Sequence, residues 1–249
     1  MSVRMLRALA RVVIVAVPAF WSCIAAADNM SALPSAIAPI SEDIVPPGAN
    51  SSEPFGGAVT QLPQGPLLDK WNAARAELRI DNDIIAACRV DPDTCESPAA
   101  KRMIGIIDEA KKRDGRARIG EINRAINLAI AATSDKSQYG VEDRWASPLT
   151  TFTSGRGDCE DYALAKYAAL RALGFDESDL SLLIVRLPQS QTDHAVLSVR
   201  YEGRWLVLDN RRFAMLDVVH LDAVPLFALR EDDRPLYSMA ALNQEPYLM

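Results

Sequence analysis

The sequence predicts an α+β domain in which a group of helices packs on an antiparallel β-sheet. In the first half of the chain, apolar residues recur every three to four positions, which is typical of amphipathic helices. Beyond residue 174 the pattern changes to short β-branched runs of alternating character, which is typical of strands. Helices that precede strands, rather than alternate with them, favour an antiparallel sheet.

Residues 1–27 have the three parts of a signal peptide. Three arginines precede a short apolar core at 12–21, and Ala25-Ala26-Ala27 offers a cleavage site. We therefore expect a periplasmic or secreted protein with no membrane span after cleavage. The alternative is a short membrane anchor that is retained. Loss of the three arginines would change the net charge from −6 to about −9. This acidic balance excludes the basic surface of a nucleic-acid-binding protein.

Residues 28–62 are rich in Ala, Ser, Pro and Gly and contain few large apolar side chains. This composition predicts a flexible leader between the signal peptide and a domain at 63–249. The alternative is an ordered strand that packs on the domain.

Three helices are expected at the start of the domain. The first begins near Leu67, the second opens at Ser97-Pro98 and ends at 111–113, and the third covers about 118–132. Their apolar stripes are most simply explained as core packing. Residues 134–153 are expected to be a loop.

Cys88 and Cys95 flank a turn-rich insert that contains Asp91-Pro92. In an oxidising compartment, a local disulfide between them is expected. The alternative is a pair of free surface thiols. With Cys88 and Cys95 paired, Cys159 would be the unpaired cysteine of the mature chain.

A fourth helix is expected over 160–173, with Gly174 suited to its C-terminal end. Strands are expected at 180–187, 195–201, 204–208 and 226–229, and Glu202-Gly203 reads as a tight hairpin turn.

Cys159 follows Gly155 and Gly157 at the start of the fourth helix. A helix N-terminus carries partial positive charge and free backbone N–H groups, which favour a thiolate and can stabilise an oxyanion. A cysteine at a helix start is also compatible with an inert buried thiol. Cys159 is therefore a candidate nucleophile that needs a base.

His194 is the candidate base and Asp209 the candidate orienting acid. His194 begins one strand of the hairpin and Asp209 ends the other, so the two side chains are expected within one or two register positions. A nucleophile, a base and an acid that orients the base are the parts of covalent catalysis. The alternative is a solvated histidine and a strand-end aspartate. His220 is expected to be structural.

Three carboxylates surround the cysteine: Asp158, Glu160 and Asp161. Negative neighbours raise the pKa of a thiol, so this setting is unfavourable for a nucleophile unless a cation is bound. Carboxylate oxygens are the ligands that calcium prefers. The alternative is that these residues cap the helix and complement its dipole. Both roles are compatible.

Four motifs, in order, resemble the bacterial transglutaminase-like cysteine peptidases, which include the LapG-type periplasmic proteases. They are Asp143 to Pro148, Gly157 to Ala163 with Lys166-Tyr167, Asp193 to Leu197, and Leu208 to Asn210. The resemblance covers about residues 65–245. It implies a papain-like transglutaminase core with Cys159 as nucleophile, His194 as base and Asp209 as orienting residue.

The resemblance also implies calcium near Asp158, Glu160 and Asp161. LapG-type enzymes clip a surface adhesin, which releases cells from a biofilm, and are sequestered by an inner-membrane receptor that senses cyclic di-GMP. A protein substrate such as an adhesin and a regulatory inner-membrane receptor are therefore the expected partners. Trp145, within the first motif, is expected to be a core aromatic.

Three functions are compatible with these residues. The first is a peptidase, in which water resolves the acyl-enzyme. The second is transglutaminase-type or amidase-type acyl transfer, which shares the first half-reaction. The third is a non-catalytic periplasmic binding module, which would have no need of an intact Cys-His-Asp set.

Overall fold

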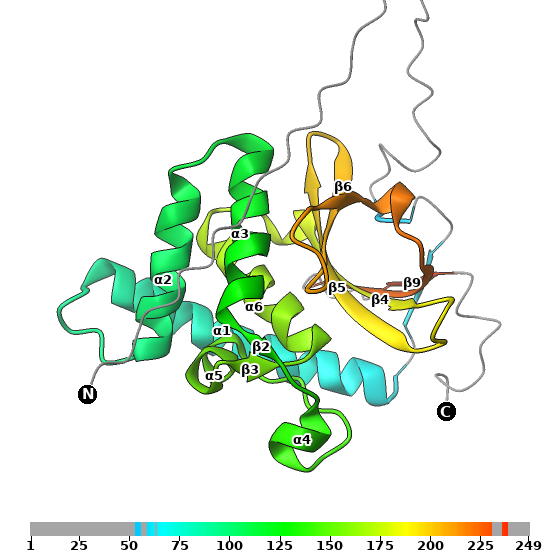
Figure 1. Cartoon of the computed structure of the whole chain (residues 1–249), viewed down its shortest axis with the longest axis horizontal. Coiled ribbons are helices and arrows are strands. Elements are labelled where there is room, and N and C mark those ends of the chain that lie inside the picture. The colour runs from blue at the N-terminus through cyan, green and yellow to red at the C-terminus, as the bar shows by residue number, and fades with distance from the viewer. Residues whose placement is uncertain (1–52, 56–58, 63, 231–235, 239–249) are drawn as a thin grey trace, which may run out of the picture. The chain divides into compact units, whose positions relative to one another are not determined.

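The computed structural model describes residues 53–55, 59–62, 64–230 and 236–238. Within this part, a layer of helices covers one face of a curled β-sheet (Figure 1). The expected signal peptide at 1–27 and the leader up to residue 52 lie outside the described residues. No helix among the described residues has the length and apolar character needed to cross a bilayer.

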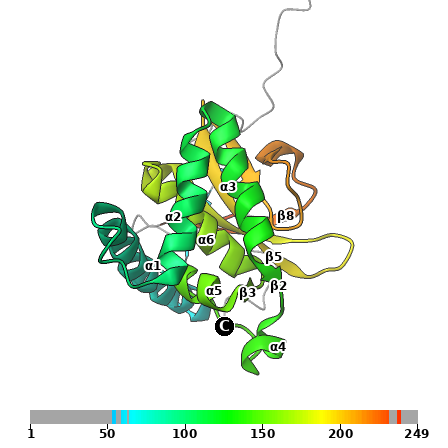
Figure 2. The ribbon, with the colours of Figure 1, turned by 60° about the vertical axis from the view of Figure 1, so that its left-hand side comes forward.

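The helical layer is built from six α-helices of the described chain. They are α1 (Pro66–Val90), α2 (Pro98–Lys111), α3 (Gly115–Ala129), α4 (Asp135–Tyr139), α5 (Pro148–Ser154) and α6 (Cys159–Ala172). Short 3-10 turns follow at η1 (Glu177–Asp179) and η2 (Val218–His220). Figure 2 shows α1, α2 and α3 around α6, which lies nearest the sheet.

The main sheet has seven antiparallel strands in the order β1-β9-β8-β4-β5-β6-β7. Its strands are β1 (Val59–Gln61), β4 (Leu180–Arg186), β5 (Asp193–Tyr201), β6 (Arg204–Leu208), β7 (Leu216–Asp217), β8 (Val224–Leu229) and β9 (Leu236–Ser238). A separate parallel pair joins β2 (Ala131–Ala132) and β3 (Arg156–Gly157). The α+β class with helices before an antiparallel sheet is therefore confirmed.

The main core lies between the helices and the sheet. Helix α6 runs through it, and all its residues from 161 to 170 are buried. A smaller apolar cluster around Trp205 occupies the opposite face of the sheet, where Phe55 and residues near η2 cover it. Helix α6 is therefore enclosed by the other helices and the sheet, with its first residue, Cys159, at the edge of the core.

The expected loop at 134–153 contains two short helices. Ser134 caps α4 by accepting a hydrogen bond from the Ser137 N–H, and Ser147 caps α5 by accepting one from the Thr150 N–H. Pro148 at the first turn of α5 suits the same start. Helices α4 and α5 each have fewer than two full turns, so neither is long enough to show an apolar repeat in the sequence.

The last residues of the expected leader include a strand of the sheet. Strand β1 lies within 28–62 and pairs with β9, and Phe55 packs on the second face of the sheet. A strand within 28–62 was the alternative to a flexible leader. Its pairing partner is almost 180 residues away in the chain, beyond the reach of any local pattern.

The structure joins Cys88 and Cys95 by a disulfide. It connects the last turn of α1 to the segment before α2, and both sulfur-bearing side chains are buried. Cys159 is the free cysteine of the described residues.

Candidate active site

Cys159 is the first residue of α6, and the segment before it is held in place by backbone hydrogen bonds. The N–H groups of Ala131 and Thr133 donate to the carbonyls of Gly155 and Gly157, each at 2.9 Å. Gly155 ends α5 with φ +66°, a left-handed conformation that favours glycine. The turn from α5 through β3 thus sets the position of the thiol at the helix N-terminus.

His194 and Asp209 form a buried pair on the β5–β6 hairpin. His194 Nε2 lies 2.9 Å from Asp209 Oδ1, and the two residues are 6% and 2% exposed. The register pairs Leu197 with Leu208, so Asp209 lies just beyond β6 opposite the start of β5. This is the proximity that the hairpin pattern predicted.

Asp209 accepts further hydrogen bonds from Arg211. The Arg211 backbone N–H donates to Oδ1 at 2.9 Å, and its guanidinium lies 3.3 Å from Oδ2. Burial alone would raise the pKa of Asp209, but the hydrogen bonds from His194 and Arg211 outweigh burial and hold this pKa well below its usual range. Asp209 is therefore an ionised acceptor suited to orienting His194.

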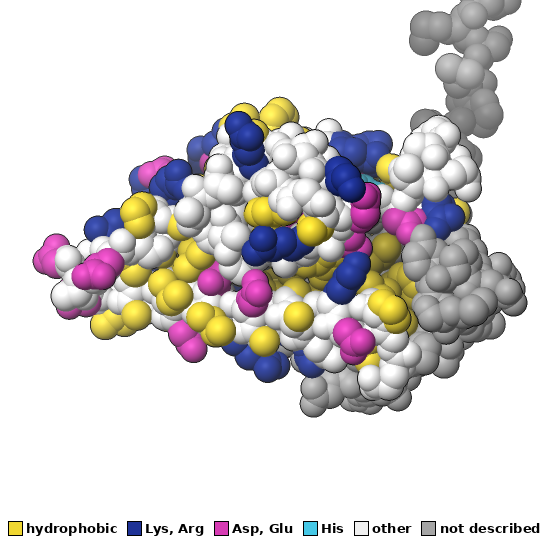
Figure 3. Space-filling model, turned by 90° about the horizontal axis from the view of Figure 1, so that it is seen from below, with side chains coloured by type: hydrophobic (Ala, Val, Ile, Leu, Met, Phe, Trp, Pro, Cys, Tyr) yellow, Lys and Arg dark blue, Asp and Glu magenta, His cyan; other side chains and the backbone are white. Residues whose placement is uncertain are grey.

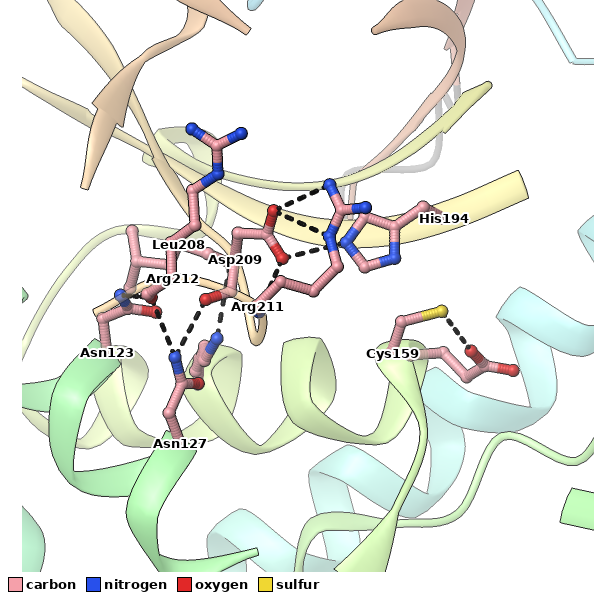
Figure 4. A network of polar contacts seen from close by, with 10 residues as sticks. Asn123, Asn127, Cys159, His194, Leu208, Asp209, Arg211 and Arg212 are labelled. Atoms are coloured by element: carbon pink, nitrogen blue, oxygen red, sulfur yellow. Dashed lines mark hydrogen bonds and ion pairs between the residues drawn. The ribbon is translucent and has the colours of Figure 1, made fainter. Parts of the chain in front are cut away.

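Helix α3 anchors the segment that carries Asp209. The Asn127 amide donates to the carbonyls of Asp209 and Arg212, each at 2.9 Å (Figure 4). Asn123, fully buried, donates to the carbonyls of Arg212 and Phe213 at 2.8 and 3.0 Å. These two asparagines had no motif to single them out, because they act from a helix some 85 residues earlier in the chain.

Cys159 and His194 line the same cavity. In Figure 4 the second ring nitrogen of His194, Nδ1, is on the side of the ring that faces the Cys159 sulfur. The cavity has a volume of about 200 Å³ and lies between α6, β5 and the start of α1. Its other lining residues are Leu67, Asp143, Trp145, Glu160, Ile184, Asp193, Ala195 and Phe227.

The cavity combines apolar walls with acidic groups. Trp145, expected in the core, packs against the core and also lines this cavity. Figure 3 shows the face on the α4 side, where apolar side chains form the floor of a hollow that acidic and basic side chains border. A cavity of this kind beside a nucleophile can hold a side chain of a polypeptide substrate.

The surroundings of Cys159 raise the pKa of its thiol. Burial raises its pKa, and the charge of Glu160 raises it further, whereas a hydrogen bond from the Ala195 N–H lowers it. The Sγ donates to Glu160 Oε2 at 3.0 Å. Burial and Glu160 thus act against the helix N-terminus, and a nearby positive charge would favour the thiolate.

The acidic residues form two groups, and the structure divides the predicted ligand set between them. Asp158 and Asp161 lie with Asp135, and Glu160 lies with Asp135 and Asp143; within each group the carboxylate oxygens are within 4.8 Å of one another. The sequence did not single out Asp135 or Asp143 as ligands. Both precede α6 by 16 residues or more, and folding alone brings them to it.

The first group has carboxylate oxygens that no hydrogen bond occupies, so they are available to a cation. Asp158 Oδ1 and Asp161 Oδ2 are buried without a hydrogen-bond partner, although Asp161 Oδ1 accepts from the Ala146 N–H at 2.8 Å. Burial, with repulsion from neighbouring carboxylates, raises the pKa of both Asp158 and Asp161 to about 7. Hard, unpaired carboxylate oxygens that repel one another fit a calcium ion.

The second group includes a competing ion pair. Asp143 forms a salt bridge with Lys70 of α1. Lys70 thus neutralises part of the negative charge of Asp143, which makes Asp143 a weaker ligand for a cation. The residues that fit a metal best are therefore Asp135, Asp158 and Asp161.

The family described as bacterial transglutaminase-like cysteine proteinases matches residues 83–222, which is more than half of the chain. The protein belongs to this family. The matched range contains Cys159, His194 and Asp209, together with the acidic groups. Membership in the cysteine proteinase family makes the protein a cysteine peptidase, as the four sequence motifs predicted.

Solved structures of Legionella pneumophila LapG share the fold of this family member. The match has 24% sequence identity and a TM-score of 0.50, and it covers 64% of this chain and 87% of the LapG chain. The calcium-bound form of LapG matches with the same figures, and the EGTA-treated form matches with 85% of its chain covered. A search of curated protein sequences found no match.

These comparisons confirm the family, the fold and the peptidase class that the sequence predicted. The individual roles of Cys159, His194 and Asp209, and the ligand roles of Asp158, Glu160 and Asp161, stay predictions. The geometry places all six within one region, around the first turn of α6 and the start of β5.

Proposed function

We propose that this cysteine peptidase is exported and cleaves a protein at the cell surface, with Cys159 as nucleophile, His194 as base and Asp209 as orienting acid. The observation that carries the proposal is the shared cavity. Cys159 and His194 line it together, and His194 is held by Asp209 through a buried hydrogen bond of 2.9 Å.

The reaction follows from these positions. His194 Nδ1 takes the proton of Cys159, and the thiolate attacks the carbonyl carbon of the scissile peptide. Backbone N–H groups at the α6 N-terminus stabilise the oxyanion. The imidazolium then gives its proton to the amine as the peptide C–N bond breaks. The amine departs, and the acyl group stays bound to Cys159 as an acyl-enzyme. Water, deprotonated by His194, releases the acyl group and restores the thiol.

Asp209 has two tasks in this scheme. It keeps Nε2 of His194 as the hydrogen-bond donor, so that Nδ1 stays available to the thiol. Its negative charge also stabilises the imidazolium that forms. Arg211 and the two asparagines of α3 fix the carboxylate and its backbone, so the orientation of His194 is set before substrate binds.

Calcium is part of the proposal. Asp135, Asp158 and Asp161 would hold the ion, which would supply positive charge beside Cys159 and offset the carboxylates that raise the thiol pKa. Support comes from the two unpaired buried oxygens of this group. The LapG structures include a calcium-bound form and an EGTA-treated form, a fact about that protein.

Export and the class of substrate rest on the signal-peptide pattern at 1–27 and on the family resemblance. A surface adhesin is the substrate that the resemblance favours, and an inner-membrane receptor is the regulator.

The test compares the cell envelope of cells that produce the wild type, cells that produce Cys159→Ala and cells that lack the protein. One surface protein should be shortened only with the wild type, and the purified wild type should cleave it in vitro. EDTA should lower this cleavage and calcium should restore it. No difference among the three envelopes would contradict the proposed substrate class. Cleavage by Cys159→Ala would contradict the nucleophile.

A further inference from the structure

Helix α1 has a second apolar face, which is exposed in the described structure. Its first apolar face packs into the core through Trp71, Leu78 and Ile85. At 3.6 residues per turn, five further apolar positions fall within about 80° of the helix circumference and form one stripe. The exposed residues of this stripe are Ala73, Ala76, Ile80, Ile84 and Ala87.

The two isoleucines of the stripe are not explained by the stability of the helix. Ile80 is 59% exposed and Ile84 is 38% exposed, although isoleucine is a weaker helix former than alanine, glutamate or lysine. With Val90, they make up three of the seven exposed large apolar side chains of the described structure. Single exposed apolar residues are common on protein surfaces, whereas a concentration of them is typical of an interaction site.

The order of side chains along the stripe is symmetric about Ile80. Consecutive members are three, four, four and three positions apart. When a second copy of α1 packs in antiparallel orientation with Ile80 on the two-fold axis, each alanine at 76 faces Ile84 of the other copy. Ala73 faces Ala87 in the same way, over a stripe about 21 Å long. A two-fold interface requires this self-complementarity, because both copies present the same patch.

The charged residues beside the stripe agree with this pairing. Arg79 and Asp83 are exposed and flank the stripe on the same side. The two-fold axis brings like flanks together, so Arg79 of each copy lies near Asp83 of the other, which gives two ion pairs. Glu77 is on the opposite flank, away from Asp83 of the second copy. Asp69 and Asp91 lie beyond the ends of the stripe, where helices that cross at about 20° or 50° diverge.

We propose that this face of α1 is a homodimer interface, in which α1 packs antiparallel against α1 of a second copy about a two-fold axis at Ile80. One pair of helices buries less than the roughly 1,600 Å² of a standard interface, so the Kd is expected on the order of 10–100 µM.

The pairing has a consequence for the catalytic cavity. It brings the loop between Cys88 and Cys95 of one copy beside the N-terminal end of α1 of the other copy, where Leu67 lines the cavity. The inference itself does not depend on the proposed catalytic roles.

The test is sedimentation equilibrium of the purified protein at concentrations on both sides of this Kd. Ile80→Glu places two like charges on the two-fold axis and should weaken dimerisation at least roughly tenfold. The matched control is Leu128→Glu, which adds the same charge at an apolar position of α3 that is 61% exposed. It should dimerise as the wild type does.

Two further sets of variants test the antiparallel arrangement. Arg79→Glu and Asp83→Arg each turn the ion pairs into repulsions and should weaken dimerisation roughly threefold or more, and the double variant should restore it. In the Cys159→Ala background, Ile80→Cys should form a disulfide-linked dimer, because helices packed at about 8–10 Å bring facing Cα atoms within disulfide range. Ala73→Cys should not, since the two copies of residue 73 lie about 21 Å apart.

A monomer at the highest concentration would overturn the inference. So would a dimer that Ile80→Glu leaves intact, or one that Leu128→Glu weakens equally, because either result places the contact on another face. Crosslinking through Ala73→Cys, or no recovery in the double charge variant, would overturn the antiparallel pairing. If circular dichroism shows that Ile80→Glu does not fold, Ile80→Ser replaces it, with an expected loss of at least roughly threefold.

Discussion

Gly157→Ala would disturb the proposed calcium site through a single methyl group. A Cβ built on Gly157 would lie 2.6 Å from Asp161 Oδ2 and 2.7 Å from Asp161 Cβ. Atoms cannot approach so closely, so the carboxylate of Asp161 must move. Asp161 is fully buried, and its Oδ1 accepts the Ala146 N–H at 2.8 Å, so movement breaks a buried hydrogen bond.

The magnitude follows from two contributions. Overpacking of a buried site costs about 1–3 kcal/mol, and an unsatisfied buried donor at Ala146 costs about 1–3 kcal/mol. The two costs are not fully additive, because a partial shift of Asp161 relieves the clash and weakens the hydrogen bond together. We therefore expect a loss of about 2–4 kcal/mol in the free energy of unfolding. For a chain of this size that corresponds to a melting temperature lower by roughly 5–15 °C.

The assay is calorimetry of the wild type and two glycine variants, with isothermal titration of calcium. Gly155→Ala is the matched control, because φ at Gly155 is +66° and no atom lies within 4 Å of its added Cβ. It should lose about 1–2 kcal/mol from backbone strain and keep its calcium affinity. Gly157→Ala should lose both stability and calcium affinity.

Two results would refute the reasoning. Wild-type stability in Gly157→Ala would mean that Asp161 can move at no cost, against its close packing. Reduced stability with unchanged calcium affinity would remove Asp161 from the ligand set, because the carboxylate cannot be displaced and still coordinate the ion as before.

Three further predictions concern titration, the disulfide and the catalytic pair. Burial raises the pKa of Asp158 and Asp161 to about 7, so the calcium-free protein gains stability from their protonation at low pH and loses it as pH rises through 7. The stabilisation by calcium in melting curves should therefore grow from pH 5 to pH 8, and an equal increment at each pH would contradict this. Replacement of Cys88 and Cys95 by serine opens a short loop of sequence separation 7 and should cost about 2 kcal/mol in denaturant unfolding, with alkylation of Cys159 unchanged. Altered alkylation would mean that the disulfide reaches the active site. Asp209→Ala removes the acceptor for His194 Nε2 and should lower alkylation at pH 7 roughly hundredfold. Asp209→Asn should retain more reactivity, since an amide oxygen still accepts, and equal loss in both would assign the effect to charge alone.

The elements with strong periodicity were predictable from the sequence. Helices α1, α2 and α6 and strands β4, β5 and β6 begin and end within a few residues of their expected bounds. Local signals determine them: Pro98 at a helix start, Gly174 after a helix end and the Glu202-Gly203 turn. Helix α3 begins and ends about three residues earlier than expected, because its ends carry weaker signals.

The proximity of His194 and Asp209 was also predictable, since a tight hairpin determines which residues of its two strands meet. The sequence by itself thus determined the α+β class, the family motifs, the position of Cys159 at a helix start and the pairing of His194 with Asp209. Each depends on residues that are close in the chain or joined by one short turn.

Only the tertiary structure decided the rest of the site. It brought Asp135 and Asp143 to the acids of α6, and it set Asn123 and Asn127 against the segment that begins at Asp209. It also drew part of the expected leader into the sheet as β1. Contacts between residues tens of positions apart depend on how the layers pack. A periodic pattern shows which face of an element is buried, but not which distant residues it meets.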